Sequence, residues 1–285
     1  MKRRLLWKLE ELVMKVLMGG ALLLVSGSLL LILGTVVQRG LPAMNLAMIT
    51  QPPDGGYYTG AGGGILNAIL GSLYLAVGGT VVALLLGLPI ALYLQVYASR
   101  SRLVEIVQLS LDVLGGVPSI VYGAFVFSVM LLMGLRASLL GGIIALALVE
   151  LPIVCRAIQE VLKMVPVELT ESAYALGTTR WEVAWKVVVR QALPGITSAI
   201  LLGFGRGIGD AASVLFTAGY TDRLPTSLLR PVASLPLAVF FQLATPFPAV
   251  QERAYASALV LTVIVLGISI LSRLATNRLS RFAVK

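Results

Sequence analysis

The sequence predicts an all-α integral membrane protein with six transmembrane helices, both termini in the cytoplasm, and short cytoplasmic helices between spans 4 and 5. Of the 285 residues, 58% are hydrophobic and only 12% are charged. A soluble domain carries about 25% charged residues, so this chain has too few to cover a water-facing surface. Six long apolar runs predict the spans, and an uneven distribution of Lys and Arg predicts their orientation. Lipid is therefore the expected solvent for most of the surface.

Each expected span is an apolar run close to the roughly 20 residues that a bilayer-crossing helix needs. We expect spans at residues 16–37, 67–97, 113–135, 137–155, 194–219 and 254–273. Gly115, Gly116 and Pro118 predict an irregular start to the third span, and Glu150 and Pro152 interrupt the fourth. No soluble domain separates these runs, so residues 1–285 are expected to form a single transmembrane domain.

The basic residues predict the orientation of the spans. Six spans place both termini and two of the connecting loops on one side, and that side holds 16 of the 22 Lys and Arg residues, against 5 on the other side and Arg206 within a span. Cytoplasmic segments carry such an excess, so both termini are expected in the cytoplasm. The net charge of +9 is then a consequence of topology, and we expect no nucleic-acid partner.

The uncharged stretch between the last two spans is expected to be an external loop, residues 220–253. Four prolines, Pro231, Pro236, Pro246 and Pro248, would break a spanning helix repeatedly. We expect a short apolar element at residues 237–243 that folds against the bundle.

The composition also excludes several kinds of chemistry. The chain has no histidine and one cysteine, Cys155, so a His-dependent catalytic triad, a His-containing metal site and a cysteine metal cluster are excluded. No G-x-x-x-x-G-K-[ST] phosphate loop occurs. We therefore expect neither a metal nor a cofactor in this chain.

The cytoplasmic interval at residues 163–190 predicts two short helices joined at a glycine. Pro166 can open the first helix, and Gly177 supplies the left-handed position at which such a helix stops. Thr179 and Glu182 have the spacing of a capping box at the start of the second. Two interpretations remain open: a hairpin lying on the membrane surface, or a projection that a partner protein grips.

The segment ESAYALG at residues 171–177 resembles the coupling loop of ABC importer permeases, which docks on an ATPase subunit. Four phrases, at residues 62–73, 115–125, 151–183 and 203–220, further resemble phosphate ABC transporter permeases of the PstA type. The resemblance covers about residues 60–275 in matching order. It implies that these cytoplasmic helices are coupling helices and assigns contact with the ATPase to Glu171, Ser172, Ala173 and Gly177. Ser172 stands where the family has a second alanine.

The same resemblance implies a bacterial inner-membrane complex with defined partners. These are a second permease subunit of the PstC type, two ATPase subunits of the PstB type that bind ATP and Mg²⁺, and an external phosphate-binding protein of the PstS type. This chain would then form part of the path for inorganic phosphate without catalysing a reaction. Molybdate and sulfate remain alternatives, because an arginine binds any of these oxyanions.

Arg206 and Asp210 are the candidate residues of the substrate path. If the span begins at Pro194, Arg206 lies roughly 18 Å along the helix, near the middle of the bilayer. Charged groups at that depth are expensive and face protein or water. Arg206 could offer a transient contact to phosphate, with Asp210 limiting how tightly the anion binds; the alternative is a structural ion pair between the two. The phosphate permeases are expected to have glutamate where this chain has Asp210.

The glycines that surround this pair, Gly203, Gly205, Gly207 and Gly209, suit a tight seam between subunits. Gly207 to Asp210 also match the G-x-G-D string of intramembrane aspartyl proteases, which need a second carboxylate, here Asp112 or Glu150. A proton-coupled transporter would instead use Glu150 and Asp210 as relays. For Glu150 itself, a local ion pair and a place in the inner gate both stay open.

Overall fold

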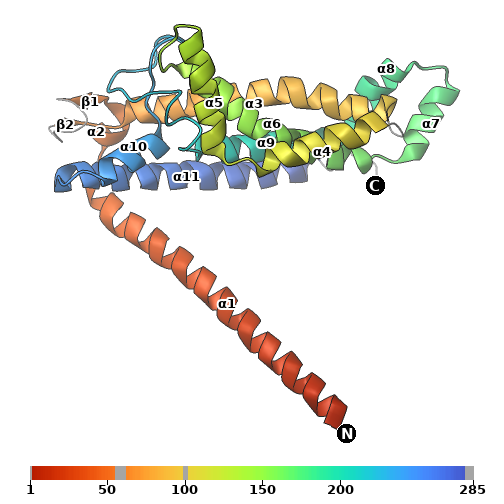
Figure 1. Ribbon diagram of the computed structural model, residues 1–285, viewed down its shortest axis with the longest axis horizontal. Coiled ribbons are helices and arrows are strands. Elements are labelled where there is room, and N and C mark those ends of the chain that lie inside the picture. The colour runs from red at the N-terminus through yellow and green to blue at the C-terminus, as the bar shows by residue number, and fades with distance from the viewer. Residues whose placement is uncertain (1, 55–61, 99–101, 280–285) are drawn as a thin grey trace.

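The computed structural model describes residues 2–54, 62–98 and 102–279, and almost all of its regular structure is helical (Figure 1). The long helices are α1 (Lys2–Gly40), α3 (Leu66–Leu92), α6 (Leu139–Lys163), α9 (Val189–Ile208) and α11 (Pro248–Leu279). The shorter ones are α2 (Leu46–Thr50), α4 (Arg102–Gly116), α5 (Ser119–Leu132), α7 (Val167–Ala175), α8 (Arg180–Glu182) and α10 (Leu235–Leu243). A 3₁₀ turn η1 (Leu41–Ala43), π-helical turns η2 (Tyr93–Tyr97) and η3 (Val183–Val188), and an antiparallel pair of two-residue strands, β1 (Pro53–Asp54) and β2 (Gly62–Gly63), complete the described elements.

Five of the described helices, extended by adjoining turns, are long and apolar enough to cross a membrane. The helices α4 and α5 form a sixth candidate if the bent pair is counted as one span. The chain is therefore a helical membrane protein with five to six candidate spans.

The expected third span, residues 113–135, is not a continuous helix. Residues 113–116 belong to α4, and α5 leaves that helix at an angle of 97°. Pro118 lacks an amide hydrogen and disfavours helical geometry at Val117, so the helix breaks between them. With 14 residues, α5 is about 21 Å long, which is shorter than the hydrocarbon core of about 30 Å.

The helix of the expected fifth span, residues 194–219, ends much earlier, at Ile208. Beyond Gly209 the chain continues as turns that pack against α5 and α6. The Thr217 carbonyl accepts a hydrogen bond from the Ser138 amide at 2.8 Å, and the Ala218 carbonyl accepts one from the Val232 amide at 2.9 Å. Glycine is a poor helix former, and the four glycines before Asp210 weaken the helix at this point. Asp210 therefore lies outside the helix that carries Arg206.

The helix of the expected fourth span, residues 137–155, instead runs on to Lys163. Pro152 lies inside α6 without ending it, which is tolerated in a membrane helix whose neighbours satisfy the freed backbone group. The helices α3, α6 and α9 pack together and enclose Cys155, Ile158 and Leu162, all nearly or fully buried.

The apolar element expected at residues 237–243 is present as α10, which begins two residues earlier, at Leu235. Its first turns are buried against α11 and α3, and the Leu235 amide donates to Ser72 Oγ at 2.8 Å. The Ser234 hydroxyl caps the helix by accepting from the Leu237 amide. The expected loop at residues 220–253 thus folds back onto the bundle.

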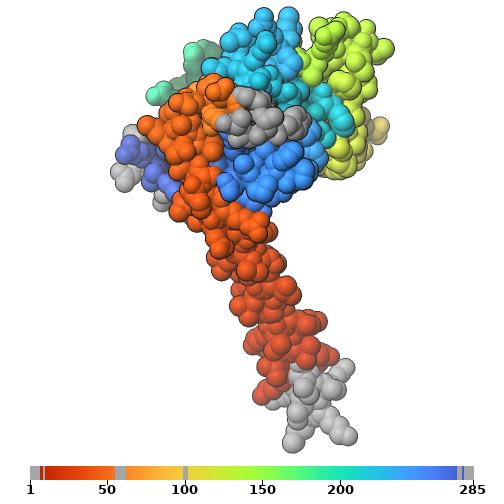
Figure 2. All heavy atoms as spheres, turned by 90° about the vertical axis from the view of Figure 1, so that its left-hand side faces the viewer, coloured from red at the N-terminus to blue at the C-terminus, as the bar shows by residue number. Residues whose placement is uncertain are grey.

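The helix α1 stands apart from the other helices. It leaves the bundle at Gly40 and extends away as a single arm (Figures 1 and 2). None of its apolar window is buried within the described chain. Its attachment is local: Arg39 lies over the ring of Tyr255, with the guanidinium carbon 5.3 Å from the ring centre, and donates to the Tyr255 hydroxyl at 3.2 Å.

Candidate coupling segment and substrate path

The segment that resembles a coupling loop folds as two short helices that meet at Gly177. The first helix, α7, follows Pro166, and Gly177 has a φ of +80°, a conformation that glycine adopts without strain. The Gly177 amide donates to the Tyr174 carbonyl at 2.9 Å, and the Thr178 amide donates to the Ala173 carbonyl at 3.3 Å. This pattern is a Schellman motif, which confirms the predicted helix stop.

The second helix starts at the predicted capping box. The Glu182 amide donates to Thr179 Oγ1 at 3.3 Å, and the Thr179 amide donates back to the Glu182 carboxylate at 3.1 Å. Lys186 forms an ion pair with the same carboxylate at 3.0 Å. The chain then continues through the π-helical turn η3 into α9, so the coupling segment is joined directly to the helix that carries Arg206.

The coupling segment projects at one end of the molecule (Figure 1). Glu171, Ser172 and Gly177 are exposed, whereas Ala173 is buried against the second helix and α6. Leu176 has 85% of its surface exposed, which is costly for a leucine in water. Of the four residues assigned to ATPase contact by resemblance, three are on the surface, and Ala173 has an internal role.

An apolar cavity of about 400 Å³ separates the coupling segment from the end of α3. Its walls include two aromatic pairs: Tyr93 stacked on Tyr97, with ring centres 5.8 Å apart, and Trp181 beside Trp185 at 5.6 Å. Both π-helical turns contribute to these walls, and such turns are frequent at functional sites.

Arg206 lies in the last turn of α9 with its side chain exposed. It makes no hydrogen bond or ion pair within the ranges that the structure describes. The guanidinium is therefore unoccupied by any described side chain and can contact a bound anion or a neighbouring subunit.

Asp210 is buried and turned toward other partners. One carboxylate oxygen accepts from Ser119 Oγ at 3.1 Å, and the other accepts from the Ser213 amide at 3.2 Å. The structural ion pair between Arg206 and Asp210, which the sequence left as an alternative, is thus not formed within this chain. Ser119 is the first residue of α5, so Asp210 lies at the helix start created by the bend. The contact with Ser119 joins residues 91 positions apart and has no local sequence signal.

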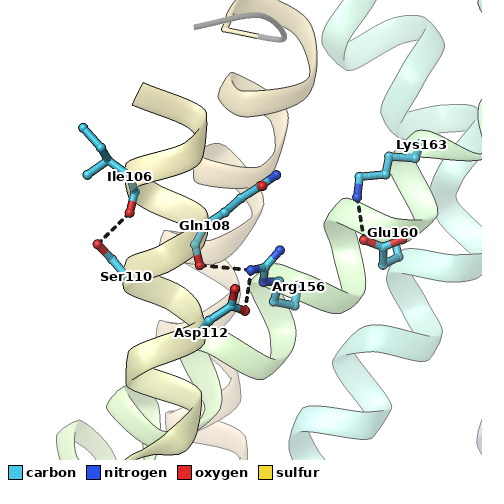
Figure 3. Close-up of polar contacts among 7 residues, drawn as sticks. All are labelled: Ile106, Gln108, Ser110, Asp112, Arg156, Glu160 and Lys163. Atoms are coloured by element: carbon cyan, nitrogen blue, oxygen red, sulfur yellow. Dashed lines mark hydrogen bonds and ion pairs between the residues drawn. The ribbon is translucent and has the colours of Figure 1, made fainter. Parts of the chain in front are cut away.

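Glu150 and Arg156 do not pair with each other. Arg156 extends from α6 to α4, where it forms an ion pair with Asp112 and donates to the Gln108 carbonyl at 3.0 Å (Figure 3). Glu150 is fully buried and accepts a hydrogen bond from Thr80 Oγ1 at 2.7 Å. The local ion pair is thus excluded for Glu150 in this structure.

The carboxylates needed by the protease alternative do not form a hydrogen-bonded dyad. Asp210 bonds Ser119 and Ser213, Asp112 pairs with Arg156, and Glu150 bonds Thr80. An aspartyl protease needs two carboxyl groups that share a proton. The described arrangement lacks this feature.

Five to six apolar spans with a projecting coupling segment define a transport permease. The family described as "Binding-protein-dependent transport system inner membrane component" matches residues 79–284, and the chain belongs to this family. It is a multi-pass inner-membrane permease, a transport component without catalytic activity.

The curated relatives are more specific. The chain is 38% identical to the phosphate transport system permease protein PstA of Yersinia pestis over 248 residues, which are 86% of this chain and 82% of the relative. It is 39% identical to the phosphate transport system permease protein PstA 1 of Mycobacterium tuberculosis (strain H37Rv) over 210 residues, 73% of this chain and 68% of the relative.

Two solved structures share the fold. An inward-facing methionine ABC transporter, MetNI, aligns with a TM-score of 0.63 at 17% identity over 75% of this chain and 95% of that chain. An amino acid ABC transporter determined with histidines aligns with a TM-score of 0.56 at 22% identity over 75% and 92%. The chain therefore has the ABC transporter permease fold.

Proposed function

We propose that this chain forms, together with a second permease subunit, the membrane path for inorganic phosphate in an ABC importer, driven by separate ATPase subunits. The observation that carries the proposal is the identity of 38% with a phosphate permease over most of both chains. An external phosphate-binding protein delivers the anion, and ATP and Mg²⁺ are bound by the ATPase subunits.

The proposed topology has six spans, with both termini in the cytoplasm. The bent pair α4 and α5 counts as the third span, and residues 220–253 lie outside. The first residues of α1, the end of α11 and the coupling segment lie toward the same end of the molecule (Figure 1). That common end supports a cytoplasmic location for all three.

In the proposed mechanism Arg206 is the anion contact of the path. A guanidinium offers bidentate hydrogen bonds to an oxyanion, and Arg206 is exposed with no described partner. Asp210, fixed by Ser119 and Ser213, places a negative charge four residues further along the chain, beyond the end of α9. This charge keeps the anion from binding too tightly, since a transported ion must also be released.

Glu171, Ser172 and Gly177 form the proposed contact with the ATPase, together with Leu176. Their exposure on a projecting hairpin supports this assignment. Movement of the ATPase then reaches α9 through the continuous chain of α8 and η3.

Phosphate uptake by cells that contain the partner subunits tests both assignments. Arg206→Ala removes a charge-assisted contact and is expected to lower uptake about tenfold or more. Arg136→Ala, an exposed arginine in the turn between α5 and α6, is the matched control and should leave uptake unchanged. Excess sulfate or molybdate should not compete; competition would replace phosphate with another oxyanion.

Co-purification tests the coupling segment separately. The ATPase subunit should be recovered with the chain and lost when residues 166–190 are replaced. Glu171→Ala and Gly177→Pro are expected to weaken recovery. If these variants and Arg206→Ala all behave like the unmodified protein, neither assignment stands.

A further inference from the structure

Glu150 is a fully buried acidic side chain at the meeting point of three helices. It projects from α6, and its carboxyl group touches Thr80 on α3. On the other side it faces α9, where it lies close to Gly203 and Gly207. The proposed function leaves this residue without a role.

The fit around the carboxyl group depends on glycine. A methyl group added to Gly207 would overlap Oε1 of Glu150. One added to Gly203 would lie 3.5 Å from Oε2, and one added to Gly79 would lie 3.3 Å from Oε1. Oε2 is held by Thr80 at 2.7 Å, while Oε1 has no hydrogen-bond partner among the described residues. The carboxyl group therefore fills the space that a side chain at Gly207 would take, whereas Val154 of α6 fills the space at Gly203.

The glycines of α9 do not all face the same way. Gly203 and Gly207 are turned inward to α6, whereas a methyl group on Gly205 would meet no described atom within 4 Å. The seam expected from four glycines is thus split: Gly207 seats Glu150 and Gly203 seats Val154 inside the chain, and Gly205 remains on an open face. A helix turns about 100° per residue, so Arg206 lies about 100° around α9 from the face that Gly207 presents to Glu150.

We propose that Glu150 is a positioning residue of the anion path. Its carboxyl group, tied to α3 by Thr80 and seated on Gly207, fixes the rotation and depth of the last turn of α9, so that Arg206 faces the path. The inference rests on the proposed role of Arg206. Burying an ionisable side chain inside a membrane protein costs free energy. In this proposal the length and shape of Glu150, rather than proton transfer, are what the transporter uses.

The first test asks whether phosphate uptake depends on the shape of the Glu150 side chain or on its ability to ionise. It uses proteoliposomes that contain the complete complex and the phosphate-binding protein. Glu150→Gln keeps the shape and the bond to Thr80, and uptake should stay within about twofold of the unmodified complex. Glu150→Ala releases α9 and should lower uptake roughly 10- to 100-fold, since a shift of about 1 Å suffices for such a loss. ATP hydrolysis stimulated by the loaded binding protein should persist. Gln159→Ala, which truncates another buried polar side chain nine residues along α6, should change neither quantity.

The second test uses compensation between Glu150 and Gly207. Gly207→Ala alone should lose uptake, because the methyl group overlaps the carboxyl group. In the double variant Glu150→Ala with Gly207→Ala, that methyl group partly fills the vacated space, so uptake should exceed that of either single variant. Gly205→Ala places a methyl group on the open face of the same helix and is the control.

The outcomes separate the two proposals. If Arg206→Ala leaves uptake unchanged, the role of Arg206 fails whatever the Glu150 variants do. If Arg206→Ala lowers uptake but Glu150→Ala does not, or if Glu150→Gln is as damaging as Glu150→Ala, the positioning role is overturned. A parallel loss of assembly, ATP hydrolysis and uptake in Glu150→Ala would also overturn it, because that pattern shows a general structural role.

Discussion

At the residue scale, the hydrogen bonds of Asp210 determine whether the Arg206 guanidinium is available to an anion. Both carboxylate oxygens of Asp210 are engaged, by the Ser119 hydroxyl and the Ser213 amide. The nearby guanidinium thus keeps its donors free of described partners. An arginine that no carboxylate of the described chain neutralises can exchange an anion quickly.

The change Asp210→Asn tests the charge without removing the hydrogen bonds. The amide oxygen can accept from the Ser213 amide, and the Ser119 hydroxyl can accept from the new NH₂ group. Loss of the negative charge should strengthen anion binding, so both KM and the maximal rate of phosphate uptake should fall. Uptake measured over a range of phosphate-loaded binding protein gives both values.

Asp210→Ala is the companion variant. It leaves the buried Ser213 amide without its acceptor, which costs about 1–3 kcal/mol. This variant should assemble less well, in contrast to Asp210→Asn. A raised KM in Asp210→Asn would contradict the role of Asp210 as a limit on binding strength.

At the scale of elements, the coupling hairpin was predictable because its signals are local. Gly177, Thr179 and Glu182 act on backbone groups within a few residues, so the helix stop and the capping box could be identified from spacing alone. The break at Pro118 was signalled too, but its angle of 97° depends on contacts with distant segments.

Other features had no local signal. Asp210 meets Ser119 across 91 residues, and Glu150 meets Thr80 across 70. The glycines of α9 were visible in the sequence, but which of them faces α6 depends on how the helices pack. The early end of α9 was missed because apolar residues continue beyond Ile208 in a segment that forms turns.

Gly177→Ala tests the hairpin as an element. At a φ of +80° an alanine costs about 1–2 kcal/mol, which should loosen the junction of the two helices and lower recovery of the ATPase subunit. Gly134→Ala is the matched control, since Gly134 has a φ of +69° in the turn between α5 and α6. Equal loss of the ATPase in both variants would point to general instability and against a coupling role.

At the scale of the whole molecule, α1 is joined to the bundle almost entirely at one end. Gly40 is buried against α11, and the apolar length before it is exposed to whatever surrounds the chain. Lipid and a second permease subunit both suit such a surface. The direction of this arm is therefore set by a small contact at its base.

Gly40→Leu should disturb that contact. A Cβ at Gly40 would lie 2.7 Å from the Tyr255 carbonyl oxygen, so a larger side chain must displace α1 or α11, at a cost of about 1–3 kcal/mol. The melting temperature of the full chain in detergent should fall. Gly34→Leu, where a Cβ would meet no described atom within 4 Å, should leave it unchanged, and an equal fall in both would refute the contact at Gly40 as the cause.

The only cysteine of the chain, Cys155, is fully buried within α6. A thiol-reactive dye will therefore find no accessible target on the natural folded protein. A single cysteine introduced at exposed Glu168, on α7 but outside the proposed ATPase contact, would carry the only reactive thiol of this chain, with Cys155 left in place. Fluorescence from that one position can then follow the hairpin through a transport cycle without a cysteine-free background having to be engineered first.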